Sequence, residues 1–258
     1  MKALITGASS GLGREMACIL SGMGYDIIAV ARRKERLEEL AAELNTKVEI
    51  VAADITDIAQ CKALAEKASE VDVLINNAGF GVFGDLCSTD LDAELRMIDT
   101  NVKAVHTLTK LFVKEFKKRN SGYILNVASL AAFFPGPLFG AYYASKSYVL
   151  RLTQALAEEL RQEHSNVHIC ALCPGPVKTE FGKVANVSFG TGSETVSKAV
   201  ILTCHDVAAY AIKQMFRRKQ VIIPGAVMKV TTFLRRITPD KMLARIVYTI
   251  QSKKCITQ

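Results

Sequence analysis

The stretch Lys2-Ala-Leu-Ile-Thr-Gly-Ala-Ser-Ser-Gly-Leu-Gly13 decides the fold, because a short apolar run leads directly into a glycine-rich turn. The apolar run predicts a buried strand, and the pattern from Gly11 to about Met23 predicts an amphipathic helix. The glycines permit a tight turn, and the free N–H groups of a helix N-terminus attract a phosphate. The spacing is G-x-x-x-G-x-G, so an ordinary strand-to-helix turn is the alternative interpretation. The strand before and the helix after favour a dinucleotide site.

Strand and helix patterns continue to alternate up to about residue 223. Further strands are predicted at 26–31, 48–53, 71–75, 122–128, 167–173 and 220–223. Because such strands pair in parallel through right-handed crossovers, we expect an α/β protein. Its single Rossmann-like domain, residues 1–224, is expected to hold a doubly wound, seven-stranded parallel sheet with helices on both faces. Residues 225–258 are predicted to form a basic, amphipathic helical extension.

Composition narrows the class of protein. Half of the 258 residues are hydrophobic, and no apolar run reaches the roughly 18 residues of a membrane span. A strand that begins at residue 2 leaves no space for a signal peptide. The seven cysteines are scattered singly, as is typical of reduced thiols. We therefore expect a cytoplasmic protein without a metal site. The net charge of +8 is concentrated in the C-terminal extension, but no nucleic-acid-binding motif accompanies it, so no nucleic acid partner is expected.

Two arginines follow the second predicted strand. A carboxylate at this place would bind the ribose 2′-hydroxyl of NAD, whereas Arg32 and Arg33 stand here instead. Arginine pairs with a phosphate bidentately, so we predict NADP(H). The alternative is that the arginines only begin a solvated helix. After the third strand, Asp54 either faces an adenine or caps the helix that starts near Asp57.

A tyrosine and a lysine share one face of a predicted helix. Tyr142 and Lys146 are four residues apart, and a cation one turn away favours the phenolate. Ser129 ends the strand at 122–128, at the sheet edge where ligands of open α/β sheets bind. A tyrosine and a lysine at this spacing also occur by chance on many exposed helices, so the pair alone does not identify a catalytic site. Asn101, a poor mid-helix residue, indicates a kink or a polar role within a long helix at about 89–118.

Several motifs in order resemble the short-chain dehydrogenase/reductase family over residues 1–224. They are TGASSGLG at 6–13, NNAG at 76–79, Asn101, Ser129, Tyr142 with Lys146, and PGPVKT at 174–179. The resemblance implies a Rossmann-like sheet and hydride transfer between a nicotinamide and an alcohol or carbonyl. It also implies that Tyr142 is the general acid or base and that Ser129 polarises the carbonyl. Lys146 would lower the pKa of Tyr142, and Asn101 would place a water behind Lys146.

The resemblance also assigns a set of cofactor-binding residues. They are Gly7, Ser9, Ser10, Gly11, Leu12, Gly13, Arg32, Arg33, Asp54, Ile55, Asn77, Ala78, Gly79, Tyr142, Lys146, Pro174, Gly175, Val177 and Thr179.

The substrate and the class of function are left more open. Loop residues Phe80, Val82, Phe133, Phe134, Leu138 and Phe139 are predicted near the substrate mouth. No Arg or Lys marks these loops, so we expect a medium-sized apolar ketone, aldehyde or alcohol. A 3-oxoacyl or steroid reductase is one alternative. A non-catalytic NADP(H)-sensing or scaffold protein on the same fold is an alternative of another class.

The C-terminal extension carries two apolar helical faces. Val227, Val230, Leu234 and Ile237 form one, and Leu243, Ile246, Val247 and Ile250 form the other. Basic residues surround both faces. Packing against the same or another subunit is favoured, and contact with a membrane surface is the alternative. A homodimer or homotetramer is expected.

Overall fold

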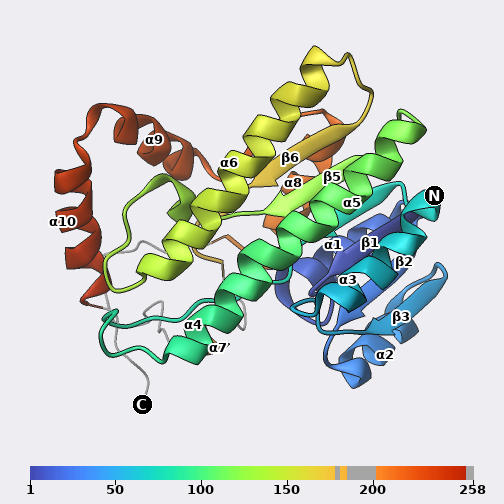
Figure 1. Cartoon of the computed structure of the whole chain (residues 1–258), viewed down its shortest axis with the longest axis horizontal. Helices are drawn as coiled ribbons and strands as arrows, with labels where there is room; N and C mark the ends of the chain where they lie inside the picture. Colours follow the sequence, from blue (N-terminus) through green and yellow to red (C-terminus); the bar gives the residue numbers. More distant parts are fainter. Residues whose placement is uncertain (178–180, 185–201, 254–258) are drawn as a thin grey trace.

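A seven-stranded sheet forms the centre of the molecule (Figure 1). The computed structural model describes residues 1–177, 181–184 and 202–253. The strands are β1 (Lys2–Thr6), β2 (Asp26–Ala31), β3 (Val48–Ala52), β4 (Val73–Asn76), β5 (Tyr123–Val127), β6 (His168–Leu172) and β7 (Val221–Ile222). Their order is β3-β2-β1-β4-β5-β6-β7, and every pairing is parallel.

Helices surround this sheet and continue beyond it. The α-helices of the described chain are α1 (Gly11–Gly22), α2 (Lys34–Glu43), α3 (Ile58–Ala65), α4 (Leu91–Ile98), α5 (Val105–Lys118), α6 (Gly140–Gln162), α7 (Phe181–Val184), α8 (Cys204–Phe216), α9 (Ala226–Leu234) and α10 (Asp240–Gln251). Shorter helical segments are η1 (Glu66–Glu70), η2 (Asp99–Ala104), η3 (Leu130–Phe133) and η5 (Arg235–Ile237).

Alternating strand residues divide the core between the two faces of the sheet. Ala3 and Ile5 of β1 pack with residues of α1, α2 and α8. Leu4, between them, packs on the other face with residues of α3 and α5. Both faces are apolar because a parallel sheet is covered on both sides. The predicted doubly wound α/β fold is therefore confirmed.

The order in which successive strands are added to the sheet reverses between β1 and β4. From β1 the order runs outward to β2 and β3 on one side and to β4, β5, β6 and β7 on the other. Crevices form at such a switch point, outside the carboxyl ends of the strands. Thr6 and Asn76 end the two strands at this point, directly before the glycine-rich turn and Asn77.

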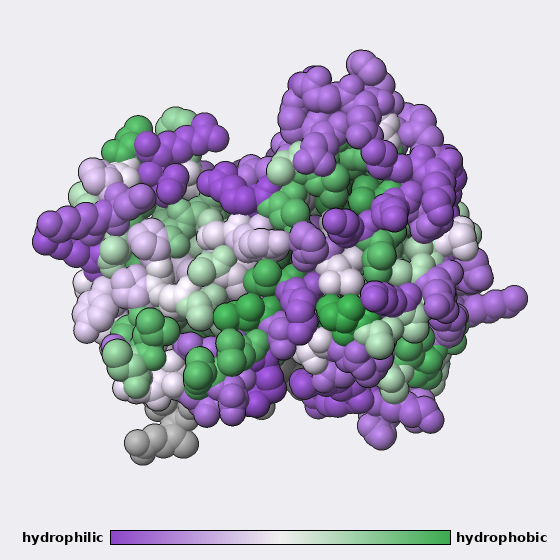
Figure 2. All heavy atoms as spheres, viewed as in Figure 1, coloured by the Kyte–Doolittle hydropathy of each residue, from purple (hydrophilic) through white to green (hydrophobic). Residues whose placement is uncertain are grey.

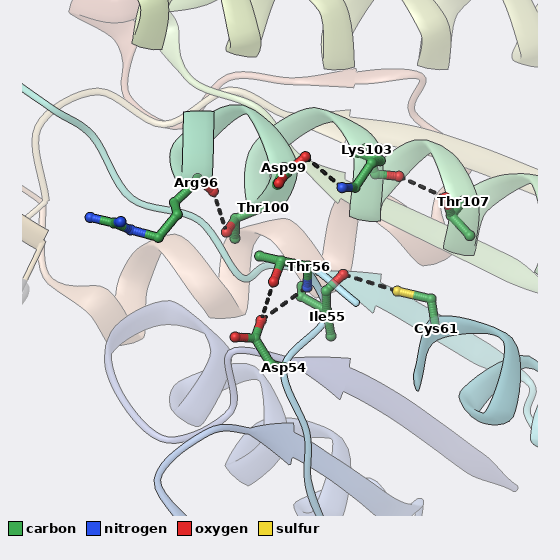
Figure 3. Close-up of polar contacts among 9 residues, drawn as sticks. All are labelled: Asp54, Ile55, Thr56, Cys61, Arg96, Asp99, Thr100, Lys103 and Thr107. Carbon is green, nitrogen blue, oxygen red and sulfur yellow. Dashed lines mark hydrogen bonds and ion pairs between the residues drawn. The ribbon is translucent and has the colours of Figure 1, made fainter. Parts of the chain in front are cut away.

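The long helix predicted at about 89–118 is interrupted by a π-helical turn. α4 passes into η2, which is π-helical, and then into α5. Such turns are frequent at functional sites because they redirect a side chain. Asn101 lies within η2 and is fully buried. Figure 3 shows this region, where Thr100 donates to the Arg96 carbonyl and Lys103 pairs with Asp99.

The C-terminal helices α9 and α10 stand beside the loop that precedes α6 (Figure 1). Leu243 of α10 is buried, whereas Ile246 and Ile250 of the same predicted face are exposed, so that face packs on protein only in part. The predicted face of α9 does not pack on protein, because Val227, Val230, Leu234 and Ile237 are all exposed while Met228 is buried. Met228 faces inward because it lies against Gly175, where an added Cβ would come within 2.8 Å of the Met228 Sδ.

Candidate active site

One cavity of about 900 Å³ extends from the glycine-rich turn to the C-terminal helices. It is lined by most of the residues predicted from the sequence, namely Gly7, Ser9, Ser10, Gly11, Leu12, Arg32, Arg33, Asp54, Ile55, Asn77, Ala78, Gly79, Ser129, Tyr142, Lys146, Pro174, Gly175 and Val177. Gly13 and Asn101 lie behind this lining. Thr179 falls outside the described residues.

The glycine-rich turn is packed too tightly for side chains. Gly7 has a φ of 68°, and a Cβ there would lie 2.8 Å from the Asn77 Nδ2. A Cβ at Gly13 would lie only 2.4 Å from both the Gly7 carbonyl oxygen and the Asn77 Nδ2. Asn77 also ties two strand ends together, since its Nδ2 donates to the carbonyls of Thr6 at 3.0 Å and Gly7 at 3.2 Å. The turn thus presents backbone and the N-terminus of α1 to the cavity, which fits the pyrophosphate of a dinucleotide.

Two arginines and an aspartate follow β2 and β3 at the same end of the cavity. The Arg33 Nη2 lies 3.3 Å from the hydroxyl oxygens of Ser9 and Ser10, so one cation borders the turn. Arg32 is exposed at the cavity wall. Figure 3 shows Asp54, whose Oδ1 accepts hydrogen bonds from the backbone N and the hydroxyl of Thr56.

The helix-cap interpretation of Asp54 is wrong. Asp57 caps α3 instead, because its Oδ1 accepts from the Ala59 N–H at 2.7 Å. Asp54 keeps its place in the cavity wall.

Ser129 and Tyr142 meet in the middle of the cavity. Ser129 follows β5, and Tyr142 lies in the first turns of α6, buried against Phe139. The rings of Tyr142 and Phe139 stack with their centroids 4.5 Å apart. Burial raises the pKa of the Tyr142 phenol, and a hydrogen bond with Ser129 opposes this rise. The expected lowering of this pKa is therefore wrong here, because removal of the phenol from water outweighs the other influences.

Lys146 reaches the same site from the next turn of α6. Its Nζ donates to the Val127 carbonyl at 2.9 Å and lies 5.8 Å from the centroid of the Tyr142 ring. Burial lowers the pKa of Lys146 to about 8, because the ammonium is removed from water. Near neutral pH this site therefore holds a protonated phenol beside a lysine that is close to losing its charge.

Asn101 fixes the loop that faces Lys146. Its Nδ2 donates to the Phe80 carbonyl at 2.9 Å and to the Ser145 hydroxyl at 3.1 Å, while its Oδ1 accepts from the Phe80 N–H at 3.1 Å. A Cβ at Gly79 would lie 2.8 Å from this Oδ1 and 3.2 Å from the Lys146 Nζ. The π-helical turn thus brings Asn101, Gly79 and Lys146 into one tight cluster.

The far end of the cavity includes many residues that sequence reasoning did not assign. α9, η5, α10 and the link between the last two contribute Met228, Thr231, Leu234, Arg235, Thr238, Met242, Leu243, Ile246, Val247, Ile250 and Gln251. Phe181 and Tyr143 also line it. The apolar spacing of α10 predicted a packing face, but nothing in that spacing indicates what the face covers. Of the six loop residues predicted near the substrate mouth, Phe80, Phe134 and Phe139 line the cavity, whereas Val82, Phe133 and Leu138 do not.

Known proteins share this arrangement. The model of the short chain dehydrogenase family matches residues 1–188. An NADP-dependent 3-hydroxy acid dehydrogenase of Schizosaccharomyces pombe is 32% identical over 85% of this chain and 88% of its own. A short-chain dehydrogenase from Sphingobium yanoikuyae, in complex with NADPH, is 28% identical with a TM-score of 0.80 over 100% of this chain and 97% of its own. A Burkholderia phymatum short chain dehydrogenase/reductase, in complex with NAD, is 27% identical with a TM-score of 0.81 over 91% and 92%.

The family match covers well over half of the chain, and the sheet order, glycine turn and buried Tyr142–Lys146 pair accompany it. This protein belongs to the short-chain dehydrogenase/reductase family, and it is an oxidoreductase that acts on CH–OH or C=O groups through a nicotinamide dinucleotide.

Proposed function

We propose that the protein is an NADP(H)-dependent oxidoreductase that reduces a medium-sized apolar ketone or aldehyde to an alcohol, or catalyses the reverse reaction. One observation carries this proposal: a single cavity joins the glycine turn and both arginines to Ser129, Tyr142 and Lys146, and then to an apolar wall.

The chemistry divides between the cofactor and the protein. When bound, the nicotinamide supplies or accepts the hydride. Tyr142 holds a proton at neutral pH because burial raises its pKa, so it is suited to protonate a developing alkoxide. Ser129, which already bonds to Tyr142, donates a hydrogen bond to the same oxygen. The reducing direction needs this protonated phenol, and oxidation needs its conjugate base.

Lys146 and Asn101 support Tyr142. Lys146 places its charge near the phenol ring and, with the residues at the strand ends, would hold the nicotinamide ribose. Asn101 positions the loop at Phe80 through both atoms of its amide and would aid a proton relay behind Lys146. The non-catalytic alternative has no support in this arrangement.

The preference for NADP(H) rests on the arginines at one end of the cavity. Arg32 is exposed in the wall, and Arg33 is close to Ser9 and Ser10 of the turn. Both side chains follow β2, where the ribose 2′-position is bound in this type of site. Two cations there favour a 2′-phosphate over a free hydroxyl.

The apolar wall favours an apolar substrate. Leu243, Ile246, Val247 and Ile250 of α10 and four phenylalanines line the cavity. A 3-oxoacyl substrate is the second candidate, because a 3-hydroxy acid dehydrogenase is among the relatives and Arg235 of the tail lines the same cavity. A steroid ketone also falls within the apolar class.

A panel of carbonyl compounds tests the proposal. Purified protein is mixed with NADPH or NADH and with apolar ketones, aldehydes, a steroid ketone, a 3-oxoacyl thioester and a charged keto acid, and absorbance of the reduced nicotinamide is followed. We expect turnover of apolar carbonyls with NADPH in preference to NADH. Turnover of the charged keto acid alone, or an absence of turnover throughout, would contradict the proposal.

We also propose a homodimer or homotetramer. Leu91, Leu95 and Ile98 of α4 are exposed at helical spacing, and Tyr148 of α6 is also exposed. Figure 2 shows a diagonal band of apolar side chains on this side of the molecule, across the region of α5 and α6. Light scattering after size-exclusion chromatography tests this, since a monomer of 28.1 kDa would contradict it.

The exposed face of α9 supports a peripheral contact with an anionic bilayer. Val227, Val230, Phe233 and Ile237 are exposed, and seven Lys/Arg against one Asp lie between residues 225 and 258. None of the described helices is long and apolar enough to span a membrane. Flotation with anionic vesicles is expected to carry the protein and to carry a Phe233→Glu variant less; equal flotation would contradict the contact. The cysteines are scattered singly along the chain, which supports a cytoplasmic location.

A further inference from the structure

Gln251 places a buried polar group in the wall of the cavity. It is the last residue of α10, and only 2% of its surface is exposed. Its Nε2 donates to the hydroxyl oxygen of Tyr143 at 2.8 Å. Its Oε1 is buried without a hydrogen-bond partner among the described residues. A buried amide oxygen in this state is unfavourable unless another group donates to it.

Tyr143 completes the polar pair from α6. Its hydroxyl oxygen accepts from Gln251, and no described residue accepts its hydroxyl proton. The ring is held by packing, because a Cβ at Gly136 would lie 2.2 Å from it, and the ring of Phe139 is 6.0 Å away. Both residues line the cavity. The pair holds one unused acceptor, the Gln251 Oε1, and one unused donor, the Tyr143 O–H. The Oε1 is covered in this structure, so the Gln251 amide must turn toward the cavity to meet a ligand.

This pair is adjacent to the proposed proton donor. Tyr142 and Tyr143 are neighbours in the chain, and their ring centroids are 6.3 Å apart at an angle of 74°. The same face of α10 contributes Val247 and Leu243 to the wall, one and two helical turns before Gln251. A molecule that reaches Tyr142 with its carbonyl thus meets apolar side chains together with one donor–acceptor pair.

We propose that Gln251 and Tyr143 bind a hydroxyl group of the substrate, separate from the carbonyl that is reduced. A hydroxyl matches the pair because it donates one hydrogen bond and accepts another. The substrate class is then an apolar carbonyl compound that carries a second, remote hydroxyl. This inference rests on the proposed function and names the substrate class for that site.

The bond between the two residues also has a structural consequence. It joins residues 108 positions apart in sequence and fixes the end of α10 to the start of α6. The amide nitrogen has a partner, the amide oxygen has none among the described residues, and the residue lines the cavity. The unsatisfied oxygen is what points to a ligand.

Matched substrates test the inference. The specificity constant kcat/KM is measured with NADPH for an apolar ketone and for the same ketone with a hydroxyl remote from the carbonyl. Wild-type protein is expected to prefer the hydroxylated ketone by roughly 10- to 100-fold, which is about 1.4 to 2.8 kcal/mol. Gln251→Leu and Tyr143→Phe are each expected to reduce this preference at least tenfold, mainly through KM. The exposed Gln162→Leu is the matched control and is expected to keep the wild-type ratio.

The outcomes separate this inference from the proposed function. Turnover of both ketones with a ratio that neither variant changes would overturn the inference and leave the proposed function intact. Turnover of neither ketone by wild-type protein would overturn both. Tyr143→Phe keeps the ring that packs on Gly136, so the fold around it is preserved. This variant therefore tests the hydroxyl preference even if Gln251→Leu destabilises α10.

Discussion

The two ends of the cavity are lined by different kinds of chemical groups. At the proposed cofactor end, backbone turns and polar side chains meet at the carboxyl ends of β1, β2 and β4, and glycines are packed against backbone. At the substrate end, helices from the C-terminal tail supply apolar side chains, with few polar groups among them. A side chain added at the cofactor end would collide with fixed backbone. A side chain changed at the substrate end contacts other side chains, which can repack. We therefore expect the cofactor end to tolerate few substitutions and the substrate end to tolerate more.

The largest expected effect falls on the glycine turn. In Gly13→Val the new side chain would collide with the Gly7 carbonyl and Asn77, so we expect cofactor binding to be abolished. Titration of protein fluorescence with NADPH measures this. Gly22→Ala is the matched control in the same helix, since a Cβ there meets nothing within 4 Å, and it is expected to bind normally. Equal binding of NADPH by Gly13→Val and Gly22→Ala would show that the glycine turn tolerates added side chains, contrary to the difference drawn between the two ends of the cavity.

A charge reversal beside the turn is expected to change which cofactor is bound. Arg32→Glu would place a carboxylate where a 2′-phosphate is expected, so the preference for NADPH over NADH should fall about a hundredfold. The ratio of kcat/KM for the two cofactors measures it. The exposed Lys114→Glu makes the same change in net charge and is expected to leave the ratio alone. If both variants altered the ratio equally, net charge would be the cause.

Raising the pH is expected to slow reduction. The pKa of Lys146 is lowered by burial to about 8, below its ordinary value, so the ammonium is charged below this pH and neutral above it. Tyr142, whose pKa is raised by burial, stays protonated over the same range. With a charged lysine required, kcat/KM for reduction should fall about a hundredfold by pH 10. A flat profile from pH 7 to 10 would show that the lysine charge is not needed.

The smallest effect is expected at the substrate end. Leu243→Ala removes a buried wall residue of α10, so KM for an apolar ketone should rise about tenfold while the Kd for NADPH is unchanged. Stability should fall by roughly 2 to 4 kcal/mol, measured by urea unfolding. A change in cofactor affinity as large as the change in KM would show that the two ends do not act separately.

The difference between the ends also explains what the sequence predicted. Gly7 and Gly13 were predicted from the glycine-rich turn and Asn77 from the family resemblance, and all three stand where few residue types fit because backbone approaches so closely. Helix α10 was predicted from apolar spacing, but the cavity it covers depends on a contact between residues 108 positions apart. The pKa of Tyr142 was expected to fall, since spacing reveals the nearby lysine but not the depth of burial. The apolar face of α9 was expected to pack on protein, but Met228 lies against Gly175 instead and that face is exposed.

The most direct test of the central claim is the turnover of Tyr142→Phe. The variant keeps the ring that stacks on Phe139 and removes only the hydroxyl. We expect kcat for carbonyl reduction to fall by about a thousandfold or more, while the Kd for NADPH stays within about twofold of wild type. Tyr148→Phe, which removes an exposed hydroxyl from the same helix, is the control and should keep wild-type turnover. Near-normal turnover in Tyr142→Phe would contradict the assignment of Tyr142 as the proton donor.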